Sequence, residues 1–230
     1  MAKRPVFIIS DRPPYYKECL VEFTYHSGFS EVQKRKSIKS LHEAFTITDP
    51  GYSIIEISSK SDNPIGIKLS AFNLAIKTKS LKEFSVESAF QASKVFQNGG
   101  PYKDILGKSS KEAKRDERLK SSGKLIYFDY FGRIFSLNPP TYFYNWLYIN
   151  SLKCKDYYIS EVMKYNAFTD IEFNPDKSIN CQAIAVAVFV SLSKLNLLDK
   201  ALESQESFLD TVYGKNITPS DYTEQINLWD

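Results

Sequence analysis

The sequence predicts an α+β fold, mainly helical, with a central buried helix and short strands. The central helix is expected to start around Ser178 and to continue to Leu192, because apolar residues cover nearly all of its sides. Short runs rich in β-branched and aromatic residues predict strands at Val6–Ser10, Cys19–Tyr25 and Leu125–Tyr130. The predicted helices outnumber the strands and do not alternate with them as βαβ units would, which indicates α+β.

Short sequence patterns predict the helix and strands of the first half of the chain. Ser30 can cap a helix that runs to about Phe45, and the residues expected on its inner side are Val32, Ile38, Leu41 and Phe45. Residues 52–58 alternate as a strand does, and the apolar run 67–76 predicts a further strand after the turn Asn63–Gly66.

Helix signals mark the second half. Ser85–Phe96 predicts a helix that stops at the Asn-Gly-Gly-Pro sequence 98–101. Ser109 with Glu112 forms a capping-box pattern, which opens a helix expected to end at Gly123. The aromatic segment 142–148 predicts another helix, and residues 199–230 are polar.

Composition narrows the class of protein. The 230 residues include 43% hydrophobic residues and carry a net charge of +3, which is typical of a globular domain. The longest apolar run, 183–190, is too short to span a bilayer, and the first residues lack the apolar core of a signal peptide. Three cysteines and two histidines without metal-ligand spacing predict reduced thiols, a cytoplasmic location, and neither a metal nor a cofactor.

Three polar residues of the predicted helix 85–96 are the most informative. Glu87, Gln91 and Lys94 stand at i, i+4 and i+7, so on a helix they form one narrow stripe among apolar residues. A carboxylate and an amine on a buried helix predict a functional pocket, because burying charge without a partner is costly. A buried Glu87–Lys94 ion pair, or a stripe that reaches solvent, would explain the same spacing.

Two further features of the sequence are typical of sites that bind anions. Lys111, Lys114, Arg115 and Arg118 fall on one stripe of the predicted helix 109–123, which can contact DNA phosphates or can simply face solvent. The N-terminus of the central helix carries exposed N–H groups and partial positive charge that suit a phosphate or carboxylate. Polar residues gather at or just before this end: Asp170, Asn174, Asn180 and Gln182.

Taken together, four motifs resemble the NADAR family, which is named for its association with NAD and ADP-ribose and includes the YbiA-like proteins. In chain order they are Leu69-Ser-Ala-Phe72, Val86-Glu-Ser-Ala-Phe-Gln-Ala-Ser-Lys-Val-Phe96, Ala113-Lys-Arg115 with Arg118, and Asp170 followed by Asn180. Further details are more similar to the NADAR antitoxins paired with DarT-type DNA ADP-ribosyltransferase toxins: 99–102, 143–148, 168–175 and 178–182. Ala71 replaces the usual Asn, and the Trp-Gly pattern of YbiA-like members is absent.

The resemblance implies a domain organisation and a task. Residues 1–60 would be a strand and helix extension packed on the core, 61–198 a NADAR-like catalytic core, and 199–230 a peripheral segment. The implied task is removal of ADP-ribose from modified guanine in DNA, single-stranded or duplex, as an antitoxin to a cognate DarT-type toxin. The rival interpretations are an N-glycosidase acting on a small ribosylamine of the riboflavin-pathway type, a non-catalytic antitoxin that binds ADP-ribose or DNA, and a nucleotide-binding module of unrelated function.

For this chemistry Glu87 and Lys94 are the expected catalytic residues, since cleavage at an anomeric carbon needs a carboxylate and a group that supports the leaving base or the opened sugar. Lys94 either forms a Schiff base with the opened sugar or stays charged and orients the substrate while Glu87 activates water. Lys111, Lys114 and Arg115 are expected at DNA phosphates. The expected substrate-binding residues are Ser70, Phe72, Asn73, Gln91, Gly99, Gly100, Tyr102, Arg118, Tyr144, Trp146, Asp170, Asn180 and Gln182.

Several of these have specific expected roles and a structural alternative. Tyr102, Tyr144 or Trp146 would stack on a base, although Trp146 also suits the core. Asp170 would bind ribose hydroxyls or serve only as a helix-entry cap. Asn180 would either mark a helix end that receives the pyrophosphate or be a plain N-cap.

Overall fold

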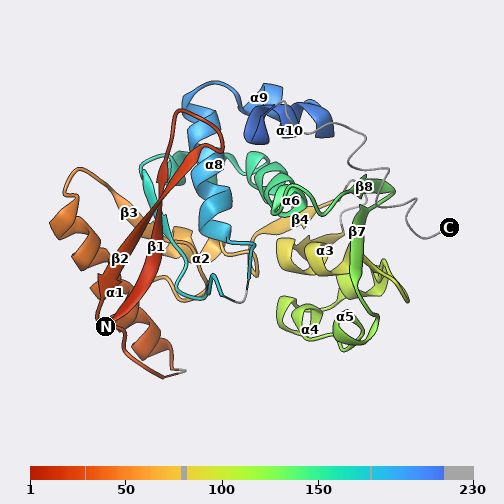
Figure 1. The fold of residues 1–230 in the computed structure, drawn as a ribbon, viewed down its shortest axis with the longest axis horizontal. Helices are drawn as coiled ribbons and strands as arrows, with labels where there is room; N and C mark the ends of the chain where they lie inside the picture. The colour runs from red at the N-terminus through yellow and green to blue at the C-terminus, as the bar shows by residue number, and fades with distance from the viewer. Residues whose placement is uncertain (29, 79–81, 177, 215–230) are drawn as a thin grey trace.

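The computed structural model describes residues 1–28, 30–78, 82–176 and 178–214 (Figure 1). Its largest sheet has the strand order β2-β1-β9-β3. Strands β1 (Ala2–Ile9) and β2 (Tyr16–Phe23) pair antiparallel along their whole length, and β1 also pairs antiparallel with β9 (Ala167–Thr169). Strand β3 (Ile54–Glu56) runs parallel to β9. The α+β class is confirmed, and the expected strands at 6–10, 19–25 and 52–58 exist with shifted bounds.

The central helix is α8 (Gln182–Lys194), in which every residue from Ala183 to Leu192 is buried. It packs against β1 and against α6 (Tyr142–Lys153) in the middle of the molecule (Figure 1). The prediction of a buried central helix is therefore confirmed. Its start is four residues later than Ser178, and Cys181 is its N-cap without a side-chain hydrogen bond.

Helix α1 (Glu31–Thr48) covers the sheet through a second cluster of buried apolar residues. Ser30 caps it by accepting a hydrogen bond from the Gln33 amide at 3.3 Å, as predicted. Ile38, Leu41 and Phe45 are buried, whereas Val32 is 62% exposed. At about 100° per residue, Val32 lies on the side of the helix opposite the other three, so its expected inner position is wrong.

The strand expected at 67–76 is largely wrong. Asn63 caps a short helix, α2 (Pro64–Lys68), by accepting a hydrogen bond from the Ile65 amide at 2.9 Å. Proline in the first helical turn and an Asn cap start a helix despite the β-branched residues that follow. The chain then turns, and only β4 (Ala75–Lys77) is a strand, paired with β5 (Glu83–Ser85).

The helix expected at 85–96 is shorter. Helix α3 (Val86–Ala92) is capped by Ser85, and the chain leaves it at Ser93 to form β6 (Lys94–Phe96). Lys94 pairs with Phe128 of β7 (Leu125–Tyr130), which also pairs with β8 (Arg133–Phe135). Lys94 is therefore a strand residue, and the helical i, i+7 spacing that linked it to Glu87 is wrong.

The helix expected at 109–123 is broken in two, α4 (Ser110–Lys114) and α5 (Arg118–Ser121), after a short 3-10 helix at Lys103–Gly107. The capping box of Ser109 and Glu112 is confirmed. The break follows from Asp116, whose buried carboxylate accepts hydrogen bonds from the Arg118 amide and guanidinium. One basic stripe along this segment is thus a wrong expectation.

The remaining helices are α7 (Asp156–Val162), α9 (Leu198–Ala201) and α10 (Gln205–Tyr213). Phe208 and Val212 of α10 are fully buried in the main core. Half of the segment 199–230, residues 215–230, lies outside the described residues. Within the described ones, no helix combines the length and apolarity needed to cross a membrane.

Candidate active site

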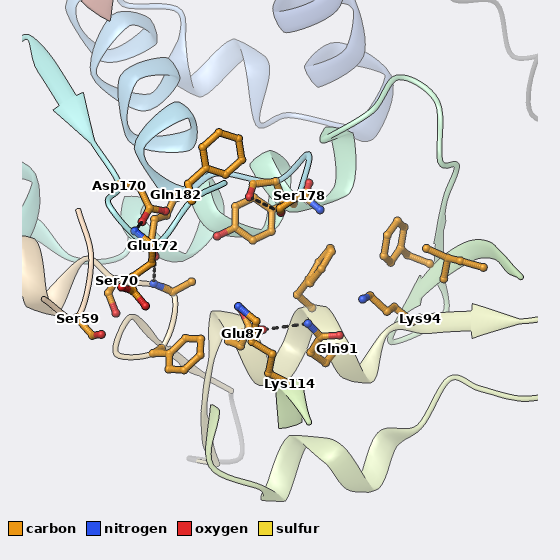
Figure 2. A pocket seen from close by; sticks show the side chains of 18 residues that line it. Ser59, Ser70, Glu87, Gln91, Lys94, Lys114, Asp170, Glu172, Ser178 and Gln182 are labelled. Carbon is orange, nitrogen blue, oxygen red and sulfur yellow. Dashed lines mark hydrogen bonds between the residues drawn. The ribbon is translucent and has the colours of Figure 1, made fainter. Parts of the chain in front are cut away.

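A cavity of about 330 Å³ lies between α3, the turn at residues 70–72 and the segment that leads into α8 (Figure 2). Many of the residues singled out in the sequence line it: Ser70, Phe72, Glu87, Gln91, Lys94, Lys114, Tyr144, Asp170, Asn180 and Gln182. The other lining residues were missed: Ser59, Ala71, Phe90, Leu125, Phe128, Glu172, Phe173 and Ser178. Segments far apart in the chain thus meet at one hollow, which no spacing along the sequence could show.

Glu87 is in the first turn of α3 and is 6% exposed. Its amide donates to the Ala71 carbonyl at 2.9 Å, so the start of α3 is joined to the neighbouring turn at residues 70–72. The Gln91 amide nitrogen donates to a Glu87 carboxylate oxygen at 2.9 Å (Figure 2). The carboxylate is thereby held within the cavity wall.

Lys94 reaches the same cavity from β6, with its ammonium nitrogen 5.0 Å from the centre of the Phe90 ring. Burial lowers the pKa of Lys94, the Glu87 carboxylate opposes this shift, and the positive charge of Lys114 adds to it. Lys114 itself lies over the Phe72 ring at 5.5 Å. The cavity lining therefore contains both a carboxylate and an amine whose neutral form is favoured by burial.

Two polar atoms of the cavity residues have no hydrogen-bond partner among the described residues. They are the Ser70 hydroxyl oxygen and the Gln91 amide oxygen, in side chains that are 2% and 6% exposed. Buried polar atoms are nearly always paired in folded proteins. Unpaired atoms in the wall of a hollow are the kind that a bound ligand satisfies.

The turn at 70–72 is fixed from three sides. The Gln182 side-chain oxygen accepts a hydrogen bond from the Ala71 amide at 2.7 Å. The Ser110 hydroxyl donates to the Phe72 carbonyl at 2.8 Å, and the Tyr148 hydroxyl donates to the Leu69 carbonyl. Gln182 thus supports the wall of the cavity as well as lining it.

Asp170 forms the opposite wall. Burial raises its pKa well above the usual range, and the nearby Glu56 carboxylate adds to the shift. One carboxylate oxygen accepts from the Glu172 amide at 3.0 Å, and the Cys181 thiol lies 3.9 Å from the other. Burial also raises the pKa of Cys181 well above its ordinary value, which disfavours a reactive thiolate.

A buried network that sequence reasoning missed lies behind Asp170. Glu56 accepts hydrogen bonds from the Ile171 amide at 2.8 Å and from the Thr169 hydroxyl at 2.5 Å. His42 of α1 lies 2.8 Å from the same hydroxyl, and burial lowers the pKa of His42 to about 4. Because the Thr169 hydroxyl donates its proton to Glu56, its oxygen can accept a hydrogen bond from the Nε2–H tautomer of His42. The available signal was a charged residue, Glu56, among the isoleucines of a predicted strand.

The structure places six expected substrate-binding residues outside the cavity lining. Trp146 packs in the core, with its ring centre 4.8 Å from that of Phe135. Arg118 pairs with Asp104 at 2.6 Å and Asp116 at 2.8 Å and lies over the Tyr102 ring at 4.4 Å. Trp146, Tyr102 and Arg118 therefore have partners within the protein and lie outside the lining of this cavity.

Asn73, Gly99 and Gly100 have local structural roles. The Asn73 amide donates to the Ile67 carbonyl at 2.9 Å. Gly99 pairs with Phe96, and a side chain at Gly100 would overlap the Lys94 carbonyl oxygen. Of the residues expected at DNA phosphates, only Lys114 lines the cavity, while Lys111 and Arg115 are exposed outside it.

The described residues contain no group of three or more His, Cys, Asp and Glu side chains arranged to hold a metal ion. An α+β domain whose central helix borders a cavity with a buried carboxylate and amine is the arrangement expected for a NADAR protein. A family model described as DarT1-associated NADAR antitoxin matches residues 2–222, and the chain belongs to this family. The protein is thus an antitoxin associated with a DarT1 toxin. A comparison with curated proteins found no match.

Proposed function

We propose that this antitoxin is an ADP-ribosylglycohydrolase that removes ADP-ribose from guanine in DNA and so reverses the modification made by its toxin. The observation that carries the proposal is the shared cavity of Glu87 and Lys94. The two side chains line it from consecutive elements, α3 and β6, and the Glu87 carboxylate acts on the pKa of Lys94 against the effect of burial. The unpaired Ser70 and Gln91 atoms supply contacts for sugar hydroxyls.

The lowered pKa of Lys94 supports the Schiff-base route over simple orientation by a charged lysine. Opening of the sugar ring leaves an imine between C1 and the guanine nitrogen. The neutral Lys94 amine adds to C1, the Glu87 carboxylate takes the proton that the Lys94 nitrogen loses and passes it to the guanine nitrogen, and the bond from C1 to guanine breaks. Water then hydrolyses the Lys94 imine, which releases ADP-ribose and returns the amine.

Trapping separates the two routes. Borohydride added during turnover should reduce the imine and leave a stable adduct on wild-type protein that mass spectrometry maps to Lys94. Lys94→Arg keeps the charge and removes the nucleophile, so it should form no adduct and release no ADP-ribose. Lys111→Arg is the matched control on an exposed lysine. A Lys94→Arg variant that still turns over would overturn the imine route.

Substrate class is tested with an oligonucleotide that carries ADP-ribosylated guanine, beside a ribosylamine metabolite. The proposal expects release of ADP-ribose from the oligonucleotide. Cleavage of the metabolite alone would favour the small-molecule glycosidase. Protection of toxin-expressing cells by Glu87→Gln as complete as that by wild type would instead show that the antitoxin works without hydrolysis.

A further inference from the structure

A second cavity, of about 440 Å³, lies beside the first and contains neither Glu87 nor Lys94. Its walls come from β1, β2, α6, α8, α10 and the loops before α6 and α8. It shares Phe173 and Ser178 with the first cavity. A smaller hollow of about 200 Å³ shares Tyr144 and Asn180 with the first cavity and Ile179 with the second, so the three hollows are neighbours that share wall residues.

The walls of the second cavity suit a flat, uncharged ring. Aromatic rings and prolines line most of it: Phe7, Tyr16, Phe173, Tyr213, Pro14, Pro139, Pro140 and Pro175. Aromatic faces stack on nucleobases regardless of their sequence. Among its lining residues that the structure describes, Glu18 is the only charged one, whereas the first cavity is lined by Lys94 and Lys114 and by the acidic residues Glu87, Asp170 and Glu172. Glu18 therefore disfavours phosphate in the second cavity, whereas the exposed Lys114 side chain offers it a positive charge at the first.

Asn145 gives the second cavity a polar anchor. Its amide nitrogen donates to the Tyr213 hydroxyl at 3.0 Å and to the Thr141 hydroxyl at 3.2 Å, which fixes the amide. Its amide oxygen is buried without a partner among the described residues, in a side chain that is only 2% exposed. A buried acceptor of this kind calls for an N–H donor such as the exocyclic amine of a base.

We propose that the second cavity binds a nucleoside, namely the adenosine end of the ADP-ribose group whose sugar lies at Glu87 and Lys94. This assignment rests on the proposed function for its choice of nucleoside. The first cavity is near the lower end of the volumes that hold small-molecule ligands, about 300–1,000 Å³. The series of hollows lets one extended ligand place its reactive sugar among the ionisable groups and its base among the rings.

Calorimetric titration of the full chain with free ADP-ribose and with AMP tests the assignment without any turnover. Ile179 is 65% exposed and lines both the second cavity and the connecting hollow, so Ile179→Trp fills the space without emptying the core. Both ligands should bind Ile179→Trp at least about tenfold more weakly than wild type, the scale of one lost base stack. Ile47→Trp, on an 83% exposed position of α1 that lines none of the three hollows, should bind as wild type does.

The outcomes separate this assignment from the proposed reaction. If ADP-ribose binds and Ile179→Trp weakens it while the modified oligonucleotide is not cleaved, the adenosine site holds and the hydrolase proposal fails. Equal binding of ADP-ribose by wild type and Ile179→Trp overturns the assignment, as does no binding by wild type. Weakened binding of unmodified DNA with unchanged binding of ADP-ribose would assign the cavity to a neighbouring base instead. Inosine monophosphate lacks the exocyclic amine, so binding equal to that of AMP would overturn the part given to Asn145.

Discussion

The side-chain amide of Gln91 donates a hydrogen bond of 2.9 Å to the carboxylate of Glu87, one turn earlier in the same helix. Both side chains are 6% exposed, so the pair is part of the wall of the cavity and not of the surface. The bond occupies one carboxylate oxygen and sets the direction of the other. Gln91 therefore acts on Glu87 as a positioning residue, and its own amide oxygen remains available to a ligand.

Replacing Glu87 with glutamine should abolish proton transfer at the sugar while keeping the size and the hydrogen bonding of the side chain. We expect kcat for release of ADP-ribose to fall about 10²–10⁴-fold, the usual contribution of general acid–base catalysis. Chromatography of released ADP-ribose measures the rate, and circular dichroism checks the fold. Glu83→Gln, at an exposed position of β5 three residues before α3, is the matched control and should retain full activity.

Replacing Lys114 with methionine should raise the pKa of Lys94, because the Lys114 charge is one of the causes that lower it. If the neutral Lys94 amine is the nucleophile, activity rises as pH increases through its pKa, so this rise should move to higher pH in Lys114→Met. The shift should shrink in high salt, which screens the interaction. Lys111→Met should leave the pH profile of kcat/KM unchanged, and an unmoved profile in Lys114→Met would contradict the coupling.

Replacing Glu56 with alanine should destabilise the wall that carries Asp170. The Ile171 amide and the Thr169 hydroxyl would lose their acceptor, at a cost of about 1–3 kcal/mol for each unsatisfied buried group. Urea unfolding measures the loss, and Glu22→Ala, at an exposed position of β2, is the control. A change in stability equal to that of the control would show that the network does not hold β9 and β3 together.

Glu56 also makes stability depend on pH. Burial raises its pKa above the ordinary 4.5, so the folded state holds a proton that the unfolded state has released. The contribution of protonated Glu56 to the free energy of unfolding is fully present below pH 4.5, and it is lost as the pH rises through the pKa of Glu56 in the folded state. Glu56→Gln cannot titrate, so its stability should fall less than that of wild type over this range.

Replacing Gly100 with alanine should disturb the strand that carries Lys94. Gly100 has φ +96°, and an added Cβ would overlap the Lys94 carbonyl oxygen. Strain of this kind costs about 1–3 kcal/mol. Gly51→Ala is the control, because no atom lies within 4 Å of a Cβ at Gly51. Thermal unfolding should show a large loss for the first and little change for the second, and equal stability would mean that the Gly100 turn relaxes freely.

The sequence was sufficient to predict several secondary-structure elements that depend on neighbouring residues. The caps at Ser30, Ser85 and Ser109 each bond within three residues of themselves, so short patterns predicted the starts of α1, α3 and α4. The apolar run 183–192 predicted a buried helix because a helix with no polar side has to be enclosed. Strand β7 was predicted at its observed bounds because its β-branched and aromatic residues favour extended backbone.

Long-range pairing decided the rest. Lys94 is in a strand because Phe128, far along the chain, offers its backbone as a partner. Glu56 is buried because β3 pairs with β9. The residues near Lys94 and Glu56 carry no sequence pattern that indicates these strand pairings. The end of α3 and the network behind Asp170 were therefore not predicted.

The sequence by itself determined the class of fold, the family likeness and the choice of Glu87 and Lys94, because these depend on residue types and on short-range order. Only the tertiary structure decided how the two side chains reach one hollow, from a helix and from the strand after it. The tertiary structure also places Trp146 and Arg118 outside the lining, because Trp146 packs in the core and Arg118 pairs with the carboxylates of Asp104 and Asp116. A cavity is enclosed by side chains from segments that are distant in the sequence, so its lining depends on tertiary packing and not on any one segment.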